Sequence, residues 1–228
     1  MSHFSLAVFH RKDQSIDELL EPYNENIPVE PYVRFTRQEA IDYARKNYGA
    51  ELMPDEECWK MVAEGCETDS DGNIYSTYNE NSRWDWWEIG GRWRGSLRNH
   101  GRKVDSGRID DLDFRIDKKV YDECLRFWDV EVEHEPAKAG ESYFPFYNEN
   151  YLRECYGDRE TYARLNAQFS TFAVLLPDGS WHEKGHLGWF GFSGETADEE
   201  RAWLESYKPR FLDTADPDWY LTVVDCHI

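Results

Sequence analysis

The chain closes on Trp219-Tyr-Leu-Thr-Val-Val-Asp-Cys-His227 and opens on His3-Phe-Ser-Leu-Ala-Val-Phe9. Both stretches are rich in β-branched and aromatic residues, and both have the length of a single strand. Because the two patterns are strong, we expect both strands near the centre of one sheet.

The segments between these strands mix helical and strand patterns. Thr36-Arg-Gln-Glu39 and Thr196-Ala-Asp-Glu199 are capping boxes that predict helix starts. Pro177-Asp-Gly179 predicts the tight turn of a hairpin. Helices interleaved with hairpin-linked strands favour an α+β fold, with a mainly antiparallel sheet and flanking helices.

We find no convincing linker, so the sequence predicts a single domain over residues 1–228. Two stretches interrupt it, at about 98–117 and 131–142. Both are polar and acidic, and we expect them to be irregular excursions.

The formal net charge is −20, from 46 acidic and 26 basic residues. A negative field of this size repels phosphate backbones, so we expect no binding to duplex nucleic acid. The acidic residues are scattered, which favours a simple contribution to solubility. The alternative is an acidic inhibitor that mimics DNA and occupies a DNA-binding partner.

The five cysteines have no C-x-x-C spacing, and their number is odd. This favours reduced thiols and a cytoplasmic protein over a disulfide framework or a zinc ribbon. The first residues show no signal peptide, and no stretch has the length of a membrane span, so we expect no membrane partner.

A tryptophan-rich segment, Trp84-Asp-Trp-Trp-Glu-Ile-Gly-Gly-Arg-Trp93, contains four of the ten tryptophans. Rings alternating with charged residues are typical of a pocket, where aromatic faces stack on flat ligands and polar groups orient them. The Gly90-Gly91 pair predicts a bulge or a close approach to the backbone. The alternative is a ring-rich core in which Arg92 stacks on tryptophan and pairs with Asp85. The predicted ligand contacts are Tyr78, Asn79, Asn81, Trp84, Asp85, Trp86, Arg92 and Arg94.

The two ends of the chain supply a second candidate site. If the first and last strands are neighbours, His3, Asp225, Cys226 and His227 meet at one end of the sheet. Such a set can bind a metal or exchange protons, and we assign catalysis to His3, Asp225 and His227. The alternative is a set of hydrogen-bonded structural histidines. His3-Phe-Ser5 is similar to one half-motif of two-histidine phosphoesterases, but the second half-motif is absent. We assign no metal ligand and no cofactor.

The segment Ser76-Thr-Tyr-Asn-Glu-Asn-Ser-Arg-Trp-Asp-Trp-Trp-Glu-Ile-Gly-Gly-Arg-Trp93 resembles a family of uncharacterised phage and bacterial proteins. Their pattern reads Ser-Thr-Tyr-Asn-x-x-Ser-Lys/Arg-Trp-Asp-Trp-Trp/Tyr-x-Ile-Gly-Gly-Arg-Trp. Glu80 stands where proline is common, and Arg83 stands where lysine is common. The resemblance extends to the first residues, to Gly188-Trp-Phe-Gly191 and to the last residues. It implies a small accessory protein that acts against, or within, host defence.

Our leading hypothesis is therefore a phage-type accessory protein that binds a small, flat, anionic ligand of the nucleotide type, with a host defence protein as a possible partner. One alternative is a metal- or histidine-dependent hydrolase or phosphoesterase. The other is the acidic inhibitor or DNA mimic. Whether the protein is an enzyme stays open at this point.

Overall fold

The computed structural model describes residues 2–143, 148–185 and 194–228. Contacts between Cα atoms divide the chain into two compact units. The larger unit combines Met1–Glu21 with Trp84–Ile228, and the smaller unit is Pro22–Arg83. The expectation of a single domain over 1–228 stays a prediction, and the experiment at the end of this subsection tests it.

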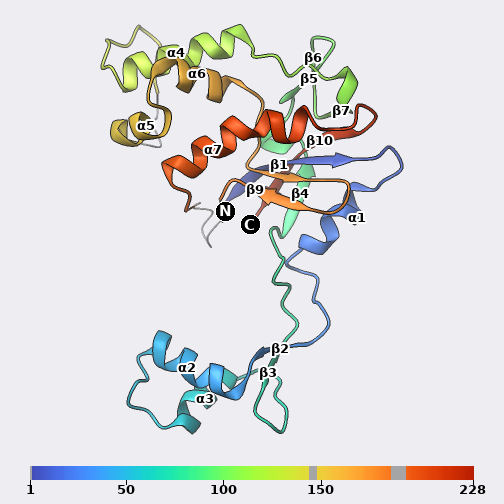
Figure 1. Ribbon diagram of the computed structural model, residues 1–228, viewed down its shortest axis with the longest axis vertical. Helices are drawn as coiled ribbons and strands as arrows, with labels where there is room; N and C mark the ends of the chain where they lie inside the picture. Colours follow the sequence, from blue (N-terminus) through green and yellow to red (C-terminus); the bar gives the residue numbers. More distant parts are fainter. Residues whose placement is uncertain (1, 144–147, 186–193) are drawn as a thin grey trace. The chain divides into compact units, whose positions relative to one another are not determined.

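The larger unit contains the main sheet and most of the helices (Figure 1). Its strands are β1 (His3–His10), β4 (Trp86–Ile89), β5 (Leu97–Asn99), β6 (Arg102–Val104), β7 (Ser106–Arg108), β8 (Ala173–Leu175), β9 (Trp181–Glu183) and β10 (Tyr220–His227). Its helices are α1 (Ile16–Leu20), α4 (Lys118–Glu131), α5 (Glu149–Tyr156), α6 (Arg159–Ala167) and α7 (Ala197–Tyr207), with short helical turns at Gly91–Trp93, Ile109–Asp111 and Lys208–Leu212.

The first and last strands form the centre of the sheet, as expected. The strand order is β4-β10-β1-β8-β9, and β7 also pairs with β10. Antiparallel pairing of β1 with β10 runs from His3 opposite His227 to His10 opposite Tyr220. Among the strands of the described residues, β1 and β8 are the one parallel pair. The fold is therefore α+β, with a mainly antiparallel sheet and flanking helices, as predicted.

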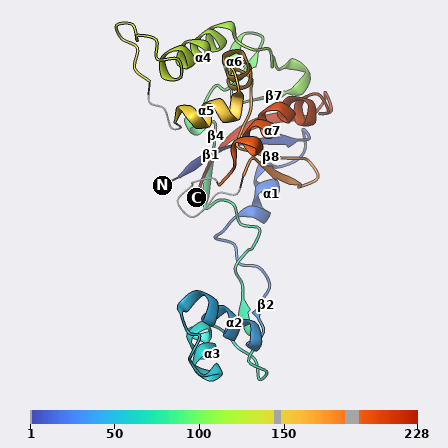
Figure 2. The ribbon, with the colours of Figure 1, turned by 60° about the vertical axis from the view of Figure 1, so that its left-hand side comes forward.

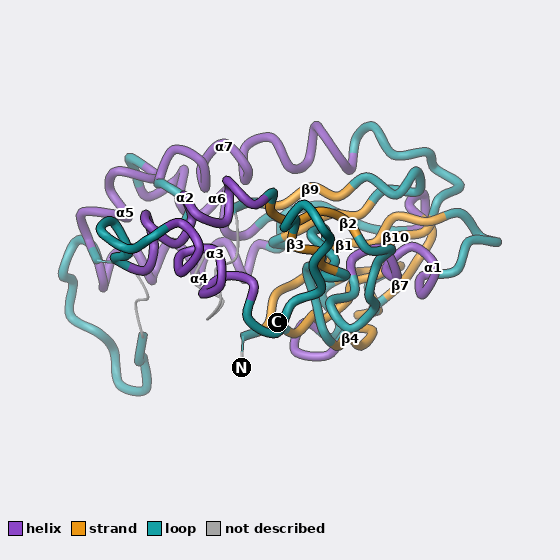
Figure 3. Tube along the Cα trace, turned by 90° about the horizontal axis from the view of Figure 1, so that it is seen from below, coloured by secondary structure: helices purple, strands orange, loops and turns teal. Residues whose placement is uncertain are grey.

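One face of the two central strands packs against the helices. Successive side chains of a strand point to opposite faces. Four odd-numbered residues of β1 and β10 belong to the cluster that the helices complete: Ala7, Phe9, Leu221 and Val223. Figures 2 and 3 show α7 running along this side of the sheet. The even-numbered residues Phe4, Leu6 and Val8 are buried as well. Burial on both faces explains the uninterrupted apolar run in β1. The helix-side cluster includes Ala7, Phe9, Trp128, Tyr156, Leu165, Trp203, Tyr207, Leu221 and Val223.

The expectation for residues 98–117 was wrong. This stretch contains most of the β5–β6 hairpin, and it contains β7, which pairs with β10 opposite Tyr220, Leu221 and Thr222. Strands of three residues are too short to show periodicity, so polarity alone suggested a loop. Residues 132–142 carry no helix or strand, as expected. The Gly188–Gly191 part of the family resemblance lies outside the described residues.

The smaller unit is a helical pair beside a two-stranded sheet. It contains β2 (Tyr32–Phe35), α2 (Arg37–Tyr48), α3 (Asp55–Ala63) and β3 (Ile74–Ser76), and β2 pairs antiparallel with β3. The predicted capping box is present, because the Thr36 side chain accepts from the Glu39 amide while the Glu39 carboxylate accepts from Thr36. Ile41, Ala44 and Cys58 form a small separate core.

No helix in the described ranges combines the length and apolar character that a membrane crossing requires.

We expect the larger unit to fold without the smaller one. The Arg83 amide donates to the Tyr23 carbonyl at 2.8 Å, so the two ends of the smaller unit lie side by side. Replacing residues 24–82 by Gly-Gly should leave a folded protein with a melting temperature within about 4 °C of the transition of the larger unit, since about 1 kcal/mol shifts Tm by about 2–4 °C at this size. Circular dichroism during a thermal scan measures this. Loss of cooperative unfolding in the shortened chain would instead support one indivisible domain.

Candidate functional site

Three ring-bearing side chains form a row across the ends of three neighbouring strands. Trp86 of β4 is opposite His227 of β10, and His227 is opposite His3 of β1. The rings of His3 and His227 are 5.0 Å apart between centroids and meet edge to face, and His3 meets Trp86 at 6.4 Å. Cross-strand neighbours of this kind share one face of the sheet.

Each histidine is held by its own carboxylate. His3 Nδ1 lies 2.7 Å from Asp225 Oδ1, and His227 Nδ1 lies 2.5 Å from Asp85 Oδ1. An ionised carboxylate accepts hydrogen bonds and cannot donate them, so Nδ1 is the donor in each of these pairs. The Nε2 atom of His227 is buried and has no hydrogen-bond partner among the described residues.

Asp225 is fixed by a backbone amide as well as by His3. The carboxylate is 1% exposed, and its second oxygen accepts from the Arg92 amide at 2.9 Å. A Cβ at Gly91 would lie 2.4 Å from the Asp225 side chain, so only glycine permits this approach. Gly91 also has φ +47°, which favours glycine.

The neighbouring Gly90 allows a second carboxylate, that of Asp105, to approach the backbone. A Cβ there would lie 2.7 Å from the carboxyl carbon of Asp105, whose oxygen accepts from the Gly95 amide at 2.5 Å. The expected close approach at Gly90-Gly91 is thus confirmed, and the approaching groups are two carboxylates of the protein itself.

Of the four terminal residues expected to meet at one end of the sheet, three do so. His3, Asp225 and His227 lie together on one face. Cys226 does not join them, because the alternation of β10 directs its side chain to the opposite face. Burial there raises the pKa of the Cys226 thiol well above its ordinary value, which keeps the thiol protonated.

The residues predicted to contact a ligand separate into two groups. Tyr78, Asn79 and Asn81 belong to the smaller unit, and the remaining five belong to the larger unit. Asn79 is only 5% exposed, because its amide donates to the carbonyls of residues 22 and 24. Trp84 is only 6% exposed, and its indole donates to the Leu20 carbonyl. We therefore remove Asn79 and Trp84 from the ligand contacts.

The other predicted ligand contacts of the larger unit are not buried. Trp86 is 49% exposed beside His3. Asp85 pairs with His227, a role that differs from the expected ligand contact. The side chains of Arg92 and Arg94 are exposed. The sequence analysis did not predict the Asp85–His227 pair, because it grouped Asp85 with the neighbouring tryptophans as a ligand contact. The pairing depends on β4 lying beside β10, which brings Asp85 close to His227.

Four cavities are described for the part of the chain outside 144–147 and 186–193, and all four are lined by residues outside the tryptophan-rich segment. None of the four cavities described is lined by Trp84, Trp86 or Arg92. A cavity of about 220 Å³ lies one row further along β1, where Ser5 is opposite Asp225. Its lining includes Lys184 and Trp203. The candidate site is therefore the row of rings at the strand ends, which adjoins this cavity through Ser5.

Among the described residues, no group of three or more His, Cys, Asp or Glu side chains is placed to hold a metal ion. The two histidines use their Nδ1 atoms on carboxylates instead.

The fold and the site define an α+β protein with two His–Asp pairs at adjacent strand ends. Comparison of the chain with family models, with curated proteins and with solved structures finds no match.

We expect Gly91→Ala to disturb the site more than a glycine change elsewhere. Gly101 is the matched control, since its φ is +79° and nothing lies within 4 Å of an added Cβ. Both variants carry the cost of a positive φ, but only Gly91→Ala adds a clash, which typically costs about 1–3 kcal/mol. Urea denaturation should show that difference in the free energy of unfolding. Equal losses in the two variants would contradict the close approach of Asp225.

Proposed function

We propose that the protein binds a small anionic molecule with a flat ring, of the nucleotide type, at the row formed by Trp86, His227 and His3. The observation that carries this proposal is the pair of carboxylate-held histidines beside a half-exposed tryptophan. An exposed indole at a site of fixed polar groups is suited to stacking on a base.

The anionic part of the ligand has two sources of positive charge. Each imidazole can take up a proton while its carboxylate stabilises the imidazolium that forms. Arg92 contributes its amide to Asp225, and its exposed side chain starts at the edge of the site. A guanidinium presents paired donors to phosphate oxygens.

The proposal also includes a cytoplasmic location and a role against host defence. All five cysteines are free, as in a reducing compartment, which supports the cytoplasm. A role against host defence rests on the resemblance of the central motif to phage-encoded proteins.

Titration calorimetry with the four ribonucleoside monophosphates tests the binding proposal. Stacking on an aromatic ring contributes about 1–3 kcal/mol per base, so Trp86→Ala should raise Kd by roughly 5- to 150-fold. Tyr48→Ala is the control, because Tyr48 is a similarly exposed ring on α2 of the smaller unit. An unchanged Kd in Trp86→Ala, or no binding at millimolar concentration, would sink the proposal.

A second candidate function, hydrolysis of a phosphoester, is favoured by the presence of two separate His–Asp pairs. One imidazole can take a proton from water as the water oxygen attacks phosphorus. The other, as imidazolium, can give its proton to the leaving oxygen as the P–O bond breaks. The reaction consumes one water molecule, and proton exchange with solvent restores the starting states. General acid–base catalysis of this kind contributes typically about 10²–10⁴-fold.

Release of product from nucleotides and from an activated phosphodiester measures this activity. We expect His3→Asn or His227→Asn to lower kcat at least about 100-fold and to remove one limb of a bell-shaped pH profile. His10→Asn is the matched control, because His10 lies at the other end of β1 and bonds Thr222. Comparable losses in all three variants would show a structural effect, and an inactive wild-type protein would leave binding as the only proposed function.

A further inference from the structure

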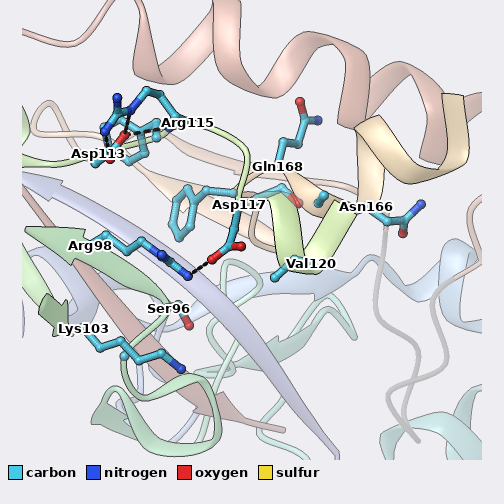
Figure 4. Close-up of a pocket in the computed structure, with 14 residues that line it drawn as sticks. Ser96, Arg98, Lys103, Asp113, Arg115, Asp117, Val120, Asn166 and Gln168 are labelled. Carbon is cyan, nitrogen blue, oxygen red and sulfur yellow. Dashed lines mark hydrogen bonds and ion pairs between the residues drawn. The ribbon is translucent and has the colours of Figure 1, made fainter. Parts of the chain in front are cut away.

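A polar cleft lies away from the histidine row, between the β5–β6 hairpin and the N-terminal end of α4 (Figure 4). Its volume is about 390 Å³, within the range of small-molecule pockets. The hairpin, the segment 113–117 and the end of α6 all contribute to its walls. No residue of the two His–Asp pairs lines it.

Two cations stand opposite each other on the hairpin. Arg98 of β5 pairs in register with Lys103 of β6, so the two side chains share one face. Figure 4 shows both side chains extending from the hairpin in the same direction. Like charges directly opposite across two strands repel each other. A negative group between them would remove that repulsion.

The two cations differ in their partners. Arg98 donates to Asp117, which also accepts from the Lys119 amide at 2.7 Å as the N-cap of α4. This pairing holds the guanidinium in place and leaves further N–H groups for a ligand. In the described part of the chain, no hydrogen bond or ion pair of the Lys103 ammonium is found. The Lys103 stem packs over Gly95, within 3.1 Å of where a Cβ would lie.

The other charged pair of the cleft, Arg115 with Asp113, is neutral as a pair. Arg115 forms a two-point pair with Asp113, at 2.8 and 2.7 Å, which holds the pKa of that carboxyl well below its usual range. Figure 4 shows this pair set apart from Arg98 and Lys103. Three cations against two carboxylates leave one net positive charge on a chain of formal charge −20. The lining of the cleft is therefore positively charged on a protein that is acidic as a whole.

An apolar wall completes the cleft. Phe114 and Phe169 line it with ring centroids 5.8 Å apart, and Val120 lines it from α4. Rings beside a pair of cations suit a molecule that joins an apolar or aromatic body to a compact anion. A phosphomonoester supplies up to two negative charges and three oxygens, enough to meet both the guanidinium and the ammonium.

We propose that this cleft is a second ligand site, which binds the phosphate of a small phosphomonoester between Arg98 and Lys103 and its apolar body against Phe114 and Phe169. The site is separate from the histidine row and does not depend on the function proposed there.

Titration calorimetry of the full chain with phenyl phosphate, inorganic phosphate, benzoate and phenol tests this. Phenyl phosphate should bind most tightly, because it alone offers both the ring and the phosphate. Lys103→Ala should raise its Kd about tenfold or more, and Lys103→Arg should keep the Kd within about threefold, since a charge-assisted contact is lost in one and kept in the other. Lys103 is exposed, so both variants should fold.

Two controls separate this site from other causes. Lys60→Ala removes the same charge from an exposed lysine of the smaller unit and should leave the Kd unchanged. His227→Asn should also leave it unchanged. The proposal is overturned if phenyl phosphate fails to bind at millimolar concentration, if Lys103→Ala has no effect, or if His227→Asn alone weakens binding. Tighter binding of benzoate than of phenyl phosphate would overturn the assignment to phosphate.

Discussion

The antiparallel pairing of β1 with β10 is the interaction on which the rest of this structure depends. It joins residues separated by more than two hundred positions, from His3 opposite His227 to His10 opposite Tyr220. The entropy lost on closing such a loop grows only slowly with its length, and burial of both faces of the strands offsets it. β4 and β7 attach to β10, and β8 attaches to β1. Without the pairing of β1 with β10, the sheet has no central strands, and nothing brings His3 next to His227.

The second constraint is the approach of carboxylates to the Gly90-Gly91 backbone. Asp225 lies against Gly91 and accepts from the Arg92 amide, and Asp105 lies against Gly90. A buried carboxylate is costly unless its oxygens are satisfied, and the amide together with His3 satisfies both oxygens of Asp225. The position of His3 thus depends on a glycine that is distant in sequence. The two glycines at this turn are therefore required by the packing of the protein's own carboxylates.

Short sequence patterns correctly predicted the helices and strands in which those patterns occur. The capping box at Thr36 and the strong strand patterns at the chain ends appear as expected. The prediction of an irregular excursion at residues 98–117 was wrong, because the strands there are too short to show a periodic pattern. The tetrapeptide Tyr-Asn-Glu-Asn, at 23–26, 78–81 and 147–150, shows how one local sequence can have two structural roles. At 23–26 and 78–81 the first asparagine accepts from the amide two residues later, which makes a turn, whereas Asn148 accepts from the amide of Tyr151 and caps a helix. The same tetrapeptide can therefore form a turn or cap a helix, and the residues that follow it determine which of the two forms.

The sequence by itself determined that the two ends of the chain are strands, and the two-residue period of a strand places Asp225 and His227 on the same face. It also determined that glycines at 90 and 91 admit a close approach. Only the tertiary structure decided that Asp85 pairs with His227, that Trp84 is buried while Trp86 stays half exposed, and that the cations of the hairpin border a cleft. The reason is physical: strand alternation is a local property of the backbone, but which face is covered, and by which carboxylate, depends on segments that pairing brings together from far along the chain.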